Sequence, residues 1–92
     1  MISYEPLWAT MKARNITKYQ LIFYWGISSN TLRRMSHDEP ISTATLNEFC
    51  LILNCQPQDI ISFKPTKEEL ETIDNQVEEI NNRKRKHKKN KP

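Results

Sequence analysis

The chain has 92 residues, and its 14 Lys and Arg outnumber its 11 Asp and Glu, so its formal net charge is +3. This length allows one small domain with an appendage. Two cysteines are too few for a disulfide framework or a cysteine-based metal site, and neither a signal peptide nor a long apolar run is present. We therefore expect a cytoplasmic protein that does not span a membrane.

Charge divides the chain into three segments. Residues 1–65 hold six basic and five acidic residues, a net of +1, whereas residues 66–82 hold one base and six acids, a net of −5. Residues 83–92 hold seven bases and no acid, a net of +7. The last segment has no apolar residue to bury, so we expect a domain over 1–65, an acidic segment over 66–82 and a disordered basic tail over 83–92.

The first two predicted helices have clear start signals. Pro6 suits the first turn of a helix. Thr17 and Gln20 have the spacing of a capping box for a second helix that runs to about Trp25. Gly26, the only glycine of the chain, then suits a sharp turn, because glycine takes positive φ without steric cost.

Three further helices follow within the first 65 residues. Ser28 or Ser29 can cap a third helix that continues to Met35. Ser42 can cap a fourth, and Pro57 opens a short fifth. No alternating apolar pattern is long enough to predict a strand, so we expect this part of the chain to be all-α.

The acidic segment predicts one more helix, because Thr66 and Glu69 form another capping box. Its apolar residues follow the 3-4-3 spacing of a heptad pattern, and they are Leu70, Ile73, Val77 and Ile80. Three uses remain open: this helix can fold onto its own domain, form a homodimer or bind another protein.

The second and third helices, joined at Gly26, have the layout of a helix-turn-helix. The apolar residues expected to form the wedge between them are Leu21, Ile22, Trp25, Ile27, Leu32 and Met35. In DNA-binding proteins of this design the second helix enters the major groove.

The stretch "ITKYQLIFYWGISSNTLRRM" and the later "PIS..TL" and "LNC.P.DI" patterns resemble the Cro-type (Xre-type) helix-turn-helix family of phage and bacterial regulators. The similarity covers roughly residues 2–63. It implies a five-helix bundle of the phage-repressor-like type, with double-stranded DNA as partner, a homodimer, and no cofactor.

The resemblance makes residues 17–25 the supporting helix and residues 28–35 the recognition helix. The implied base contacts are Ser29, Asn30 and Arg33. Residues implied to contact either a base or a phosphate are Ser28, Thr31 and Arg34. Implied phosphate contacts are Thr17, Lys18, Gln20, Ser42 and Thr43. The chemistry agrees, because arginine pairs with guanine and asparagine with adenine, although a solvated helix face is the alternative for each residue.

Three residues depart from the family pattern. The family usually has a small residue at the position of Ile22, so we expect slightly splayed helices. Phe23 and Tyr24 are expected to face outward, where polar residues are commoner, and two adjacent aromatics favour a contact surface.

We therefore expect a sequence-specific DNA-binding regulator, a repressor acting as a dimer. The alternative is a protein-interaction module, such as an antitoxin or anti-repressor, that acts through residues 66–82.

The basic tail can be a solubilising segment or an arm that attracts phosphate, and RNA binding through the tail alone is a third hypothesis. No enzyme is expected, because the sequence shows no phosphate-binding loop, metal-ligand cluster or useful Cys/His spacing, and hence no catalytic residue.

Overall fold

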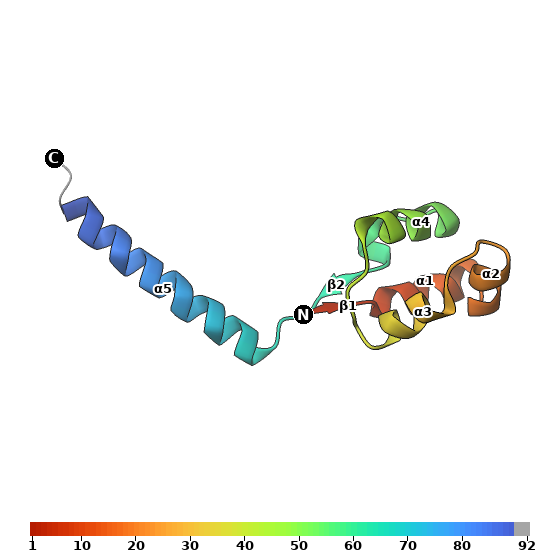
Figure 1. The fold of residues 1–92 in the computed structure, drawn as a ribbon, viewed down its shortest axis with the longest axis horizontal. Coiled ribbons are helices and arrows are strands. Elements are labelled where there is room, and N and C mark those ends of the chain that lie inside the picture. The colour runs from red at the N-terminus through yellow and green to blue at the C-terminus, as the bar shows by residue number, and fades with distance from the viewer. Residues whose placement is uncertain (90–92) are drawn as a thin grey trace.

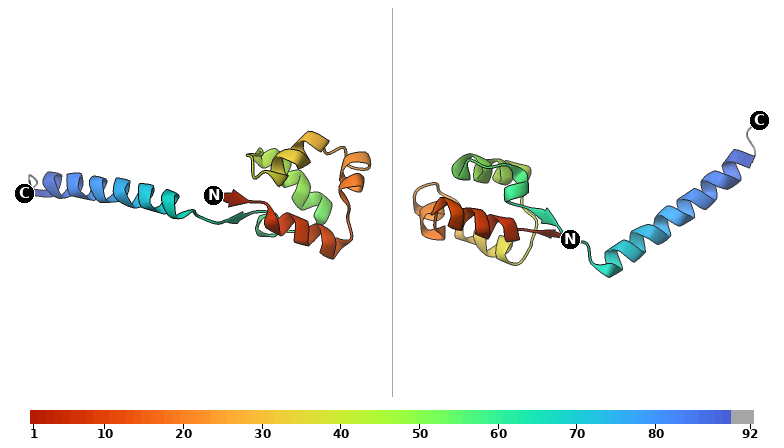
Figure 2. Two further views of the ribbon diagram at one scale, coloured as in Figure 1. Left: turned by 90° about the horizontal axis from the view of Figure 1, so that it is seen from below. Right: turned by 180° about the vertical axis from the view of Figure 1, so that it is seen from behind.

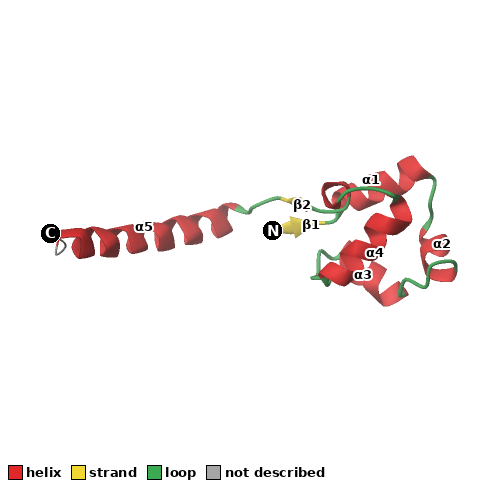
Figure 3. Ribbon diagram, turned by 90° about the horizontal axis from the view of Figure 1, so that it is seen from above, coloured by secondary structure: helices red, strands yellow, loops and turns green. Residues whose placement is uncertain are grey.

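The computed structural model describes residues 1–89, and its elements are mostly helical (Figures 1 and 3). The helices of the body, which we define as residues 1–65, are α1 (Glu5–Arg14), α2 (Lys18–Phe23), α3 (Ser29–Ser36) and α4 (Thr43–Leu53). The remaining elements are β1 (Ile2–Ser3), the 3₁₀ turn η1 (Pro57–Asp59), β2 (Ser62–Phe63) and α5 (Lys67–Lys89). The expected all-α fold is confirmed, with a small strand pair added.

Helix starts follow the predicted caps. Thr17 accepts a hydrogen bond from the amide of Gln20 at 3.2 Å, and the Gln20 side chain accepts one from the amide of Thr17 at 2.8 Å. Ser28 caps α3 and Ser42 caps α4, each accepting a bond from an amide in the first turn. These caps satisfy amides that a helix start leaves without a partner.

The core of the body joins all four helices to Ile60, the residue that follows η1. Its buried residues are Tyr4, Leu7, Met11, Leu21, Ile27, Leu32, Met35, Phe49, Leu53 and Ile60. Four of the six expected wedge residues are among them, and Ile22 is half-buried against this core.

The prediction that Trp25 belongs to the wedge was wrong, because its side chain is 45% exposed. Helix α2 ends at Phe23, two residues earlier than predicted, so the chain has already begun to turn at Trp25. The indole lies edge-on to the Tyr24 ring, with the ring centroids 6.3 Å apart, and contributes little to the wedge.

Tyr4 is a core residue that the sequence did not single out. Its ring is 3% exposed, and its hydroxyl donates a 2.7 Å hydrogen bond to the carbonyl of Glu39. Burial raises the pKa of this hydroxyl. Tyr4 thereby connects the start of α1 to the loop that follows α3.

The fifth helix of the body is a single 3₁₀ turn, shorter than expected. Pro57 opens it, and the carbonyl of Pro57 accepts hydrogen bonds from the amides of both Ile60 and Ile61. The chain then becomes extended because β2 pairs antiparallel with β1, with Ile2 opposite Phe63. Two-residue strands are too short to show alternation, which is why the sequence did not predict them.

Helix α5 begins at Lys67 as expected but continues to Lys89, so it includes residues 83–89, which we expected to be disordered. Lys and Arg are good helix formers, and cations are favourable near a helix C-terminus, as are acids near its start. The rest of the predicted tail, residues 90–92, lies outside the described residues.

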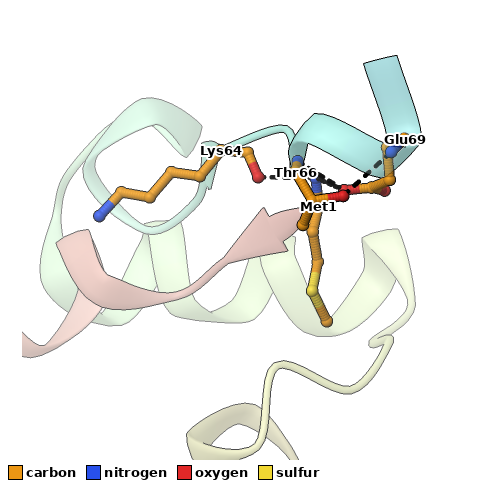
Figure 4. Close-up of polar contacts among 4 residues, drawn as sticks. All are labelled: Met1, Lys64, Thr66 and Glu69. Carbon is orange, nitrogen blue, oxygen red and sulfur yellow. Dashed lines mark hydrogen bonds and ion pairs between the residues drawn. The ribbon is translucent and has the colours of Figure 1, made fainter. Parts of the chain in front are cut away.

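The first turn of α5 is held against the N-terminus of the chain (Figure 4). The Met1 amine donates to the carbonyl of Lys64 and to Oε1 of Glu69, both at 2.9 Å. The amide of Thr66 donates to the same oxygen at 3.0 Å. Thr66 and Glu69 thus form the predicted capping box, and the Met1 amine adds a contact between α5 and the body.

Beyond that junction α5 extends away from the body, and α2 lies at the opposite end of the molecule (Figures 1 and 2). Among residues 1–89, no helix is both long and apolar enough to cross a membrane.

Gly26 has φ +70°, and a Cβ built there meets no atom within 4 Å. Substitution is therefore limited by backbone strain and not by space. We expect Gly26→Ala to lower the free energy of unfolding by about 1–2 kcal/mol. Gly26→Asn should cost less, because asparagine tolerates this region, as Asn15 (φ 58°) and Asn54 (φ 49°) do here. Urea unfolding of both variants measures this, and equal losses would contradict it.

The pKa of Glu69 is lowered, first by the Thr66 amide and then by the Met1 amine. A lowered folded-state pKa stabilises the fold above the ordinary carboxyl pKa of about 4.3, and that contribution is lost as the pH falls through the lowered value. We expect the Glu69 carboxyl to titrate below the ordinary glutamate value of about 4.3 in a carbon-detected NMR titration. A Glu69 midpoint at the ordinary value would contradict the anchoring contact.

Candidate nucleic-acid interface

The turn between α2 and α3 is set by three consecutive residues, Gly26, Ile27 and Ser28. The left-handed backbone at Gly26 reverses the chain, and the amide of Ile27 donates a 2.9 Å hydrogen bond to the carbonyl of Leu21. The Ile27 side chain is buried in the core. Helix α3 then begins at Ser29 under the Ser28 cap, so its orientation relative to α2 is determined by packing and by one backbone bond.

Two of the predicted base-reading residues form a pair on the exposed side of α3. Arg33 Nη2 donates a 2.7 Å hydrogen bond to Oδ1 of Asn30. The bond leaves the Asn30 amide group and the other guanidinium donors available, because asparagine has two amide donors and arginine five. Asn30 therefore orients Arg33 while both retain donors for a base edge or a phosphate.

Arg34 has a different environment from its neighbour. It is half-buried, and its Nη2 donates a 2.6 Å hydrogen bond to the carbonyl of Pro40. This contact joins α3 to the loop before α4. Of the two adjacent arginines, Arg33 is the one whose side chain extends from the exposed helix surface.

Several hydroxyl and amide groups predicted to bind DNA also cap helices. Thr17 and Gln20 bond to each other at the start of α2, and Ser28 accepts from the amide of Asn30 at 3.1 Å. Thr31 is half-buried. Ser29 remains exposed.

A shallow cleft between α2 and α3 brings three predicted contacts together. Its volume is about 260 Å³, and its lining includes Lys18, Ser29 and Arg33, with Ile22 at its apolar side. The Lys18 ammonium also lies 4.8 Å from the centroid of the Trp8 ring, a cation–π contact that holds this charge beside α1.

Ser42 and Thr43 belong to a different surface. They line an apolar groove of about 540 Å³ together with residues from the N-terminus, the loop after α3 and the first turn of α5. Ser42 Oγ also accepts a 3.1 Å hydrogen bond from the amide of Thr45 and donates one of 3.1 Å to the Thr45 hydroxyl. The structure therefore does not bring these two predicted phosphate contacts into the cleft of Lys18 and Arg33.

The helix-turn-helix surface is short of negative charge. Between Pro6 and His37 the chain has five Lys and Arg and no Asp or Glu. A surface with this bias attracts phosphate without regard to sequence.

Exposed aromatic side chains gather on α2 and directly after it. Tyr19 and Phe23 are 65% and 67% exposed, and their ring centroids lie 4.4 Å apart. Tyr24 is also exposed, so both Phe23 and Tyr24 face outward as predicted. Tyr19 was missed, although its spacing of four residues from Phe23 places the two on one helix face.

Within residues 1–89 no three His, Cys, Asp or Glu side chains are grouped so that they could hold a metal ion. Cys50 and Cys55 are free thiols, and burial raises the pKa of Cys55.

Comparison with known proteins agrees with this geometry. Residues 6–66 match the model of the Cro/C1-type HTH DNA-binding domain. A solved structure, that of the transcriptional regulator VanUg in its crystal form II, is similar at 32% identity and a TM-score of 0.65, over 71% of this chain and 87% of that one. No curated protein sequence matches the chain significantly. The family match covers well over half of the 92 residues, and the chain belongs to the Cro/C1-type helix-turn-helix DNA-binding family.

Proposed function

We propose that this protein is a sequence-specific transcriptional regulator, a repressor that binds DNA in the cytoplasm as a homodimer and places α3 in the major groove. The body, residues 1–65, is the DNA-binding domain in this proposal, and α5 is a separate functional segment. The observation that carries the proposal is the Asn30–Arg33 pair on the exposed side of α3, beside Lys18 and Ser29 at the cleft.

The role proposed for each side chain of the cleft follows from its chemistry. Arginine can bond to guanine O6 and N7 and asparagine to adenine N6 and N7, whereas lysine binds phosphate as a point charge. Arg33 and Asn30 are accordingly assigned to base edges, with Ser29 beside them. Lys18 is assigned to the backbone.

A dimer agrees with the small size of this surface. One recognition helix contacts few base pairs, and two copies bind half-sites spaced by about one helical turn or a multiple of it. The operator is therefore expected to be palindromic.

The adjacent arginines provide a matched pair of variants. Arg33→Ala should cost about 1–3 kcal/mol of binding and relax specificity at one base position. Arg34→Ala removes the same charge but also the bond to the carbonyl of Pro40, so it should lower stability and binding at all sites alike. Binding to a selected site and to its single-base variants, with thermal unfolding of each protein, measures the contrast. Unchanged base preference in Arg33→Ala would contradict the base-reading role.

Selection of binding sites from random DNA tests the proposal as a whole. An enriched palindromic motif is the expected result. Failure to enrich any motif, together with a stoichiometric protein captured through the apolar residues of α5, would support the alternative of an interaction module. The half-exposed apolar residues of α5 are the observation that favours that alternative.

A further inference from the structure

One apolar surface of the molecule is left uncovered by the body. We call it the α5 stripe, and it consists of Leu70, Ile73, Val77 and Ile80, whose side chains are 48–55% exposed. Helix α5 extends away from the body, so no part of residues 1–65 covers this stripe (Figure 2). A stripe of this kind on a charged helix indicates a partner helix.

We propose that the α5 stripe pairs with the α5 stripe of a second copy of this chain, and that the two helices run antiparallel. The inference rests on the dimeric regulator proposed above and identifies the surface and orientation of the dimer. Two observations carry it: the symmetry of the stripe and the charges beside it.

The 3-4-3 spacing of the stripe is the same in both directions along the chain. An antiparallel arrangement centred at residue 75 therefore places Leu70 opposite Ile80 of the second copy, and Ile73 opposite Val77 of the second copy. All four apolar layers are filled without a shift in register. A parallel arrangement fills them too, so the orientation must come from the flanking residues.

Flanking residues on one side of the stripe are Glu69, Gln76 and Arg83, which follow one another at seven-residue intervals. In an antiparallel pair this side meets the same side of the second copy. Glu69 then lies beside Arg83 of the second copy, and this contact occurs twice by symmetry. Gln76 meets Gln76 of the second copy, where two amides can hydrogen-bond.

The opposite flank consists of Lys67, Asp74 and Asn81. In the antiparallel pair Lys67 meets Asn81 of the second copy, and the single like-charge contact is between the two copies of Asp74 at the symmetry axis. In a parallel pair the two flanks meet each other, and Glu69 lies beside Asp74 of the second copy, twice. Antiparallel pairing thus has two attractive contacts and one repulsive contact, whereas parallel pairing has two repulsive contacts.

Glu69 and Arg83 both have hydrogen-bonding atoms left for the contact between them. Glu69 uses Oε1 for Thr66 and Met1, and its Oε2 has no hydrogen-bond partner among the side chains described, residues 1–84. Arg83 bonds to Glu79 one turn earlier through Nη2 alone and keeps other donors.

The apolar groove beside Leu46 and Ile61 is a less suitable partner for the stripe. Its rim includes Asp38 and Glu69, and the stripe is itself flanked by Glu69 and Asp74, so docking would place acids against acids. Charge complementarity therefore favours pairing of two α5 helices.

The arrangement is compatible with a dimer that binds DNA. The N-terminal ends of the two α5 helices are separated by about 24 Å along the axis, from 16 residues at about 1.5 Å each. Each body continues outward from its end, so the recognition helices lie further apart than these ends, as half-sites about 34 Å or more apart require.

Disulfide trapping tests the orientation in the full-length chain without DNA, so its outcome is independent of DNA binding. In a Cys50→Ala/Cys55→Ala background, a Leu70→Cys chain is mixed with a longer, tagged Ile80→Cys chain and oxidised. The expected product is the mixed disulfide. In the antiparallel pair the two Leu70 positions are about 15 Å apart along the axis, beyond the reach of a disulfide. Same-residue disulfides, or no disulfide, would overturn the proposal.

Charge variants provide an independent test with the native cysteines in place. Arg83→Glu should weaken self-association roughly tenfold in sedimentation equilibrium, because two attractive contacts become repulsive. Glu69→Lys in the same chain should restore part of it, because it makes these contacts attractive again but removes the cap and the Met1 contact. Asp74→Lys should leave the association nearly unchanged, as should its control Glu68→Lys on the opposite helix face. Marked strengthening by Asp74→Lys alone would show parallel pairing, and a monomeric wild type would overturn the proposal altogether.

Discussion

The reversal of the chain at Gly26 is the constraint on which the DNA-binding surface depends. Positive φ at this residue and the bond from the Ile27 amide to the Leu21 carbonyl turn the backbone within a few residues. Ile27 can then enter the core that Phe49 of α4 also reaches. Because the same buried contacts hold α2, α3 and α4, the outward face of α3 is presented by a packed support, as the proposed base recognition requires.

Neighbouring polar residues of this surface have different hydrogen-bond partners. Arg33 is held by Asn30 and stays on the exposed side of α3, whereas Arg34 is bound to the carbonyl of Pro40. Thr17 and Gln20 already bond to each other's amides in a capping box. A side chain that already has an intramolecular partner can bind DNA only through its remaining donors or by giving up that partner, so the polar residues differ in what a contact with DNA costs.

Charge along α5 serves two purposes. Acids in its first turn and bases near its end agree with the helix dipole, which explains why the helix continues through residues that lack any apolar side chain. The same separation of charge puts Glu69 and Arg83 at opposite ends of one flank. The dipole preference and the proposed antiparallel pairing are therefore satisfied by one sequence pattern.

The sequence by itself determined the features that depend on near neighbours. The caps at Thr17, Ser28 and Ser42 and the turn at Gly26 follow from residues within a few positions of one another, because capping and turn formation are local. The exposed positions of Asn30 and Arg33 follow equally from helical spacing.

Only the tertiary structure decided the contacts between distant residues. Tyr4 is buried in a core formed by residues far along the chain, and its hydroxyl donates to the carbonyl of Glu39, 35 residues away. Strand β1 forms because it pairs with β2, some 60 residues further on. The sequence assigned both Arg33 and Arg34 to contacts with DNA, and only the structure shows that Arg34 is bound to the carbonyl of Pro40. Their difference arises from where the loop to α4 passes, and that path is set by the packing of the whole body.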